Sequence, residues 1–254
     1  MIRYINPITK VIPYEHARVA DLGDVPIQNI FDLERLNGEI TAFYQRVVDA
    51  QVVPLSVGDH SISFPILRAL GRKEAPALIH FDSHYDMAPP LKGTKFHHGA
   101  PFRNAIEEGL IDAAHSVQIA IRDPYCEMTA PFAKEAGVTV IEMADIDGMG
   151  IPAVIETVRR VVGDRPVYLS FDIDAIDPTL APGTGTPVMG GLTTREAMRI
   201  LQGLSDLRLV GADVVEVSPP YDPTGMTALL GAQLLFEILC VTAKSSRVPK
   251  KPRR

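Results

Sequence analysis

The chain has 254 residues, of which 46% are hydrophobic and 22% are charged, and its formal net charge is −6. This length and mildly acidic composition fit one large domain of a soluble intracellular protein, and neither nucleic acid nor a membrane is the expected partner. No apolar run is expected to reach the length of a membrane span, and the start lacks the pattern of a secretion signal. Because Cys126 and Cys240 are the only cysteines, we expect a reducing cytoplasm.

Apolar runs alternate with helical patterns along the chain. Strands are predicted at 51–55, 77–82, 116–121, 138–141, 167–172 and 208–217. The clearest helices are predicted at 61–70, 151–162, 194–204 and 227–243. This alternation predicts an α/β fold with a mainly parallel central sheet, in one domain over residues 1–243. Residues 244–254 are basic and could contact nucleic acid or anionic lipid, but a frayed, solvated tail is the favoured interpretation.

The segment 80–86 carries the strongest chemical signal. Asp82, His84 and Asp86 alternate with a period of two, so an extended backbone would place all three side chains on one face. A second pair, Asp172 and Asp174, follows an apolar run in the same way. Ligands at strand ends also lie where open α/β sheets place their active sites.

His60 adds a second imidazole to this set of four carboxylates. An isolated Asp-x-Asp or a lone histidine usually has a structural role, and neither would decide the matter alone. Four carboxylates at the ends of apolar strands, however, would repel one another and carry a large desolvation cost unless cations neutralised them. The mixed nitrogen and oxygen donors predict a site for hard or borderline divalent cations, and most naturally for two of them.

Several ordered motifs resemble those of the ureohydrolase (arginase/agmatinase) family. They lie at 58–61, 80–86, 98–99, 170–178, 183–187, 190–193 and 213–222. The resemblance covers nearly the whole chain and is nearest to the agmatinase branch. It implies a three-layer α/β/α fold of the arginase/deacetylase type, two Mn²⁺ ions per chain, release of urea from a guanidinium group, and a homo-oligomer, either a trimer or a hexamer.

The resemblance also implies the metal ligands. One cation would be held by His60, Asp82, Asp86 and Asp172, and the other by Asp82, His84, Asp172 and Asp174, so that Asp82 and Asp172 bridge. Two cations about 3.5–4 Å apart can share a water, lower its pKa, and present a bridging hydroxide to the guanidinium carbon.

The same resemblance assigns three catalytic residues. Glu216 would accept paired N–H bonds from the guanidinium group, although a capping or ion-paired glutamate is the structural alternative. His98, which precedes Gly99, would shuttle protons to the leaving amine, whereas the neighbouring His97 lacks the following glycine. Asp86 is counted as catalytic as well as a metal ligand.

The expected substrate is agmatine, hydrolysed to putrescine and urea, because the segment 98–119 resembles the agmatinase branch. Guanidinobutyrate and guanidinopropionate are the alternative substrates, with Lys95 or Arg103 available to pair with their carboxylate. Two other hypotheses are a noncatalytic relative that acts as a subunit, and a deacetylase that uses one zinc ion.

Two departures from the family pattern generate structural expectations. Members usually have two glycines before the aspartate, but here only Gly58 precedes Asp59, so His60 could be displaced from its ligand position. The family's usual first strand is also missing from the sequence. Its absence is expected to expose an apolar edge of the sheet and part of the substrate pocket.

Overall fold

The computed structural model describes residues 4–72 and 74–245. Its centre is a six-stranded parallel sheet with the strand order β1-β6-β5-β2-β3-β4. The strands are β1 (Leu55–Gly58), β2 (Ala77–Phe81), β3 (Val117–Ile121), β4 (Thr139–Glu142), β5 (Val167–Asp172) and β6 (Leu209–Val215). The predicted parallel α/β sheet is confirmed.

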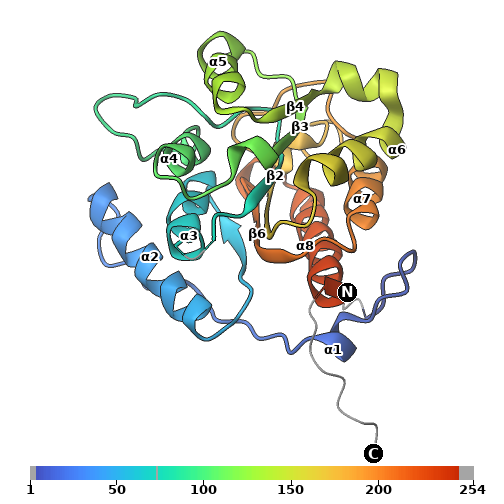
Figure 1. The fold of residues 1–254 in the computed structure, drawn as a ribbon, viewed down its shortest axis with the longest axis horizontal. Coiled ribbons are helices and arrows are strands. Elements are labelled where there is room, and N and C mark those ends of the chain that lie inside the picture. Colours follow the sequence, from blue (N-terminus) through green and yellow to red (C-terminus); the bar gives the residue numbers. More distant parts are fainter. Residues whose placement is uncertain (1–3, 73, 246–254) are drawn as a thin grey trace, which may run out of the picture.

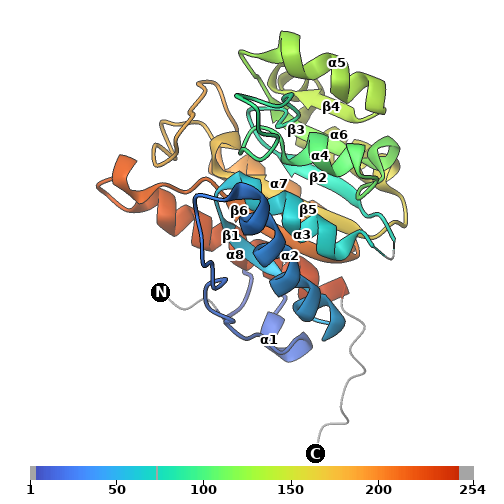
Figure 2. The same ribbon diagram turned by 90° about the vertical axis from the view of Figure 1, so that its left-hand side faces the viewer.

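Helices cover both faces of this sheet, which gives the expected three layers (Figure 1). One face carries α2 (Leu33–Asp49), α3 (Ser63–Leu70), α4 (Pro101–Glu107) and α5 (Cys126–Ala136). The other carries α6 (Met143–Val162), α7 (Thr194–Gly203) and α8 (Met226–Ser245). Figure 2 views the molecule from the side of α2, α3 and α4, which lie in front of the strands.

The two faces of the sheet differ in chemistry because side chains alternate along each strand. Phe81 and Phe171, on the face covered by α6, α7 and α8, stack with ring centroids 4.8 Å apart in an apolar cluster. The face beneath α3 holds Tyr168 together with buried polar side chains, among them His80 and Asp213. The polar groups of the site therefore gather on one side of the sheet.

Four α-helices were not among those predicted, namely α1 (Pro13–His16), α2, α4 and α5, and the first strand was placed wrongly. The run at 51–55 instead begins in the turn that follows α2, which ends at Asp49, and the N–H of Val52 bonds back to the carbonyl of Val47. The strand begins only after Pro54, whose carbonyl accepts the N–H of Ala212 in β6. Helix 151–162 is the second half of α6, which kinks at Gly150, where φ is 74°.

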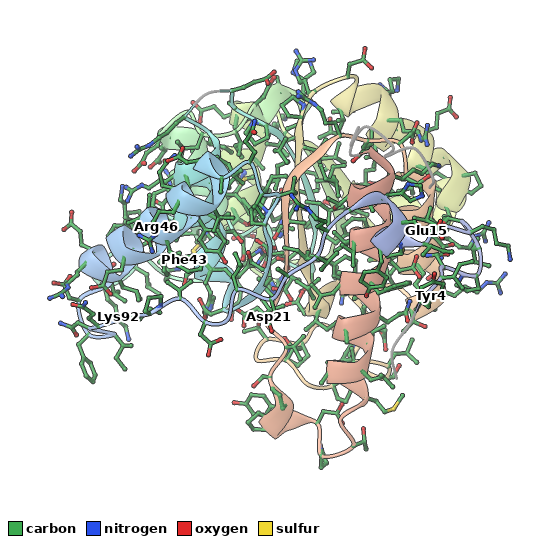
Figure 3. All side chains as sticks on the ribbon, turned by 90° about the horizontal axis from the view of Figure 1, so that it is seen from below. Tyr4, Glu15, Asp21, Phe43, Arg46 and Lys92 are labelled. Atoms are coloured by element: carbon green, nitrogen blue, oxygen red, sulfur yellow. The ribbon has the colours of Figure 1, made fainter. Side chains whose placement is uncertain are left out.

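The edge of the sheet at β1 is open, as expected. Among the described residues β1 pairs only with β6, and Val57 is 64% exposed. Seen from below, the segment that contains Asp21 runs from α1 (Pro13–His16) across to α2 (Figure 3). Residues 18–24 of this segment are exposed, as is Val57.

The expectation that no run reaches the length of a membrane span is wrong for α8. This helix is long and apolar enough by length and composition, but 61% of the apolar window is buried in the fold. Its buried Glu237 accepts hydrogen bonds from Asn6 at 2.6 Å and Gln233 at 2.9 Å. A mostly buried apolar window and a buried, hydrogen-bonded glutamate are typical of a helix in the core of a domain. Because α8 continues to Ser245, Lys244 is helical, and residues 246–254 of the predicted tail lie outside the described residues.

The packing of α8 predicts a large difference in thiol reactivity. Cys126 is exposed, whereas Cys240 is buried and burial raises its pKa to about 11. Thiolates are the reactive form, so a disulfide reagent at pH 8 should titrate one thiol in the native chain and two after unfolding. In Cys126→Ser the native count should fall to zero. Fast reaction of Cys240 in that variant would contradict the packing of α8.

Candidate functional site

The predicted ligands come from three loops at the carboxyl end of the sheet. His60 begins a short 3₁₀ helix directly after β1, and Asp174 lies in another after β5. Asp82 follows the last residue of β2. Because the strands are parallel and these ends meet at one edge, side chains far apart in sequence converge there.

Asp82, His84 and Asp86 converge for a different reason from the one predicted. Strand β2 ends at Phe81, so the three residues lie in a loop and do not alternate along a strand. Asp86 has a φ of 50°, a left-handed conformation that is uncommon outside glycine. Glu216, at the end of β6, has a φ of 62°. Strained backbone of this kind often marks a functional site.

The ring nitrogen Nδ1 of His60 is surrounded by carboxylate oxygens. It lies 2.8 Å from Oδ2 of Asp86, 3.2 Å from Oδ2 of Asp172 and 3.4 Å from Oδ2 of Asp82. A second group forms around Nδ1 of His84, which lies 3.0 Å from Oδ2 of Asp174 and 3.4 Å from Oδ1 of Asp82. Asp82 therefore turns one oxygen toward each imidazole.

When the ring is neutral, the hydrogen bonds of His60 leave Nδ1 as a bare acceptor. Burial lowers the pKa of His60, but the carboxylates of Asp86 and Asp172 outweigh this effect and raise the pKa well above its usual value, so without a cation a proton on Nδ1 is favoured. Ser170 Oγ donates to Asp213 at 2.6 Å, so it can only accept from His60 Nε2, which lies 2.9 Å away. The proton of a neutral His60 is thus on Nε2, and the lone pair of Nδ1 points at the carboxylates. In this form, lone pairs that face one another in a buried site repel unless a cation lies between them.

The mutual repulsion of the buried carboxylates also indicates a site for cations. Burial and the neighbouring carboxylates Asp174, Asp172 and Asp86 raise the pKa of Asp82 well above its usual value. Burial and Asp174 likewise raise the pKa of Asp172. The buried atoms His60 Nδ1 and Asp174 Oδ2 make no hydrogen bond with the described residues. These observations fit two divalent cations, one in each group, with Asp82 between them.

The mouth of the site is formed by Asp59, His98 and Glu216, whose polar atoms lie within 4.8 Å of one another. Glu216 Oε1 accepts the backbone N–H of His60 at 2.6 Å, so this glutamate does cap the 3₁₀ helix, as the structural alternative proposed. Burial raises its pKa. Its second oxygen, Oε2, has no hydrogen-bond partner among the described side chains and remains available to a ligand.

His98 is exposed, whereas Nε2 of His97 lies 3.3 Å from the carbonyl of Pro89. The structure therefore places His98, and not His97, beside Glu216.

Neither of the two cations suggested for a substrate carboxylate is free. Lys95 Nζ pairs with Glu108 at 3.0 Å, and Arg103 Nε pairs with Glu107 at 2.9 Å. Arg103 also lies over the ring of Phe132. Both side chains are held by groups outside the cluster.

The expected displacement of His60 does not occur. A single glycine, Gly58, suffices because Asp59 makes the turn, with its Oδ1 accepting the N–H of Ser61 at 2.9 Å. A side chain at position 58 would come within 3.2 Å of Ile62, so the glycine also permits close packing.

Sequence reasoning missed the buried polar residues behind the ligands. They are Ser63, His80, Gln118, Tyr168, Ser170 and Asp213. A signal was present, since most of them interrupt strands that are otherwise apolar. Burial lowers the pKa of His80 well below its usual value, which keeps this imidazole neutral.

Comparison with known proteins agrees with this geometry. The model of the Arginase family matches residues 2–241. Guanidinopropionase of Pseudomonas aeruginosa is 47% identical over 97% of this chain and 78% of that protein. Mitochondrial agmatinase of Gallus gallus is 43% identical over 95% of this chain and 72% of that protein. The structure of proclavaminate amidino hydrolase from Streptomyces clavuligerus is 37% identical, with a TM-score of 0.86 over 92% of this chain and 79% of that one. The chain therefore belongs to the Arginase family and is a hydrolase that acts on guanidino C–N bonds.

Proposed function

We propose that the chain hydrolyses agmatine to putrescine and urea with the help of two Mn²⁺ ions. The observation that carries the proposal is the position of Asp82, whose two oxygens face the separate donor groups of His60 and His84. Such a carboxylate fits a bridge between two cations better than the single-zinc site of a deacetylase.

The donors divide into two sets around Asp82. His60, Asp86 and Asp172 would hold one cation, and His84 and Asp174 the other, with Asp172 as the proposed second bridge. When bound, two divalent cations lower the pKa of water and so supply a nucleophile at neutral pH. Other divalent metals suit the same donors, and Mn²⁺ is proposed from the family resemblance.

The remaining polar residues would act on the substrate. Glu216 Oε2 can accept an N–H from the guanidinium group while Oε1 stays fixed by the backbone of His60, which orients the carbon toward the cluster. His98 lies within reach of Glu216 at the exposed mouth, where an imidazole can pass a proton to the departing amine. Asp86, held 2.8 Å from His60 Nδ1, fixes the first donor set.

Agmatine is proposed because the residues that could reach its far end are acidic. Asp59 is exposed beside Glu216, while Lys95 is ion-paired with Glu108, which also binds Arg68, and Arg103 is ion-paired with Glu107. Hydrolysis of a guanidino acid is the second candidate, favoured by the 47% identity to guanidinopropionase. A cytoplasmic location and a trimeric or hexameric assembly are proposed along with this activity.

The chain reconstituted with Mn²⁺ should bind two metal ions and release urea from agmatine faster than from guanidinobutyrate, guanidinopropionate or arginine. Urea release from each substrate and metal content by mass spectrometry are the measurements. If a guanidino acid is the preferred substrate, the proposal of agmatine is wrong, but the proposed hydrolysis at two metal ions stands. Two bound ions without urea from any substrate would support the noncatalytic alternative.

Replacing His98 should slow turnover without removing metal. His98→Asn keeps the size and polarity of the side chain but cannot transfer a proton, so kcat should fall by about 100-fold or more. The adjacent His97→Asn is the matched control and should stay within about twofold of the parent. Equal losses in the two variants would remove His98 from the mechanism.

Metal affinity should increase with pH. Burial alone would lower the pKa of His84, but the carboxylates of Asp174 and Asp82 raise it to about 11, so the metal-free histidine is protonated at pH 7. A cation must displace this proton, and affinity should therefore rise about tenfold per pH unit for each proton released, up to the pKa of His84. Titration calorimetry in buffers of different ionisation enthalpy counts these protons. Metal affinity that is flat between pH 6.5 and 8.5 would contradict the assignment.

A further inference from the structure

His80 is the most deeply placed imidazole that the proposed chemistry does not use. It lies within β2 and is completely buried, with its ring centroid 4.4 Å from that of Phe102 on α4. A buried imidazole needs hydrogen-bond partners for both ring nitrogens. The partners of His80 connect it to the metal cluster on one side and to the neighbouring strand β3 on the other.

Gln118 fixes the tautomer of His80. Its amide nitrogen lies 2.9 Å from His80 Nδ1 and donates at 2.7 Å to the carbonyl of Tyr85. The carbonyl of Tyr85 can only accept, so the amide group must present its NH₂ end here, and one N–H remains for the imidazole. His80 Nδ1 is therefore an acceptor, and the ring proton lies on Nε2.

The proton on Nε2 points at the proposed bridging carboxylate. Nε2 of His80 lies 2.7 Å from Oδ2 of Asp82 and donates to it. The other oxygen, Oδ1, accepts the backbone N–H of His84 at 2.6 Å. Each oxygen of Asp82 thus uses one lone pair for a fixed donor and keeps another for a cation, so the plane of the carboxylate is set on both sides.

We propose that His80, held in one tautomer by Gln118, is a positioning residue that orients Asp82 as the bridge between the two cations. The inference rests on the proposed dinuclear function. It differs from a merely structural role, because a histidine that only fills space beside Phe102 would affect the stability of the metal-free fold and leave metal affinity unchanged.

Three variants distinguish the hydrogen bond that His80 donates to Asp82 from the space that its ring fills. His80→Leu removes the donor to Asp82, His80→Gln restores an amide N–H near the former Nε2, and Gln118→Leu releases the tautomer without changing His80. Gln233→Leu is the matched control, since it is also a buried glutamine but donates to Glu237 on α8.

The first measurement is the stepwise binding of Mn²⁺ to each 254-residue chain, followed by calorimetry and by the electron paramagnetic resonance signal of the coupled pair. His80→Leu should weaken binding by about 10–100-fold and reduce the coupled signal, and Gln118→Leu should weaken it by about 10-fold. His80→Gln should bind within about threefold of the parent, and Gln233→Leu should bind as the parent does. The melting temperature of each metal-free chain reports folding.

Unchanged Mn²⁺ affinity in Gln118→Leu and in a folded His80→Leu would overturn the inference. If His80→Leu does not fold, Gln118→Leu and His80→Gln decide the matter. Urea release is measured separately on the parent chain. A parent that binds two Mn²⁺ ions but releases no urea would refute the proposed activity, while the affinities of the variants would still judge the role of His80.

Discussion

The fold depends on how it accommodates buried negative charge at the carboxyl ends of its central strands. Asp82, Asp172 and Asp174 are almost completely inaccessible to solvent, and Asp86 is only 8% exposed. Two like charges 4 Å apart repel by about 4 kcal/mol at an effective dielectric constant of 20, so several such pairs would consume much of the stability of a domain. The structure offsets the repulsion with imidazoles and backbone N–H groups, and it leaves lone pairs that only cations can satisfy.

A second buried carboxylate shows how far this polar arrangement extends. Asp213 lies in β6 beneath α3 and accepts hydrogen bonds from the hydroxyl groups of Ser63, Tyr168 and Ser170. Three donors offset much of the cost of burying this carboxylate. Because Ser170 also accepts from His60, the same arrangement orients the first donor set. The face of the sheet beneath α3 therefore combines the polar groups behind the proposed ligands with a smaller apolar cluster, and the opposite face carries the larger one.

The convergence of the proposed ligands could be predicted from sequence, because they lie at or just after the ends of apolar runs and their residue types indicate metal chemistry. The local geometry could not be predicted in the same way. Asp82, His84 and Asp86 resembled one face of a strand, but they lie in a loop whose shape depends on the left-handed backbone of Asp86. Strand β1 was misplaced because hydropathy does not distinguish the end of α2 from the start of a strand across Pro54.

Hydrogen-bond direction was beyond sequence reasoning for a different reason. The tautomer of His60 depends on Ser170, 110 residues away, and that of His80 depends on Gln118, 38 residues away. Only the register of the parallel strands brings these pairs together, with His80 opposite Gln118 on one side and Ser170 on the other. A one-residue shift in register would move every one of these partners to the other face of the sheet.

This dependence on register separates the chemistry of the site from its specificity. The buried residues behind the cluster are joined by strand pairing and by hydrogen bonds, so substitution of one of them leaves a buried partner unpaired. At the mouth, His98 is exposed in a loop, where substitutions disturb few contacts. Asp59 is also exposed, but it caps the 3₁₀ helix that begins at His60. Relatives named for different guanidino substrates can therefore share this cluster, and substrate choice is expected to follow the charge of a few residues at the rim.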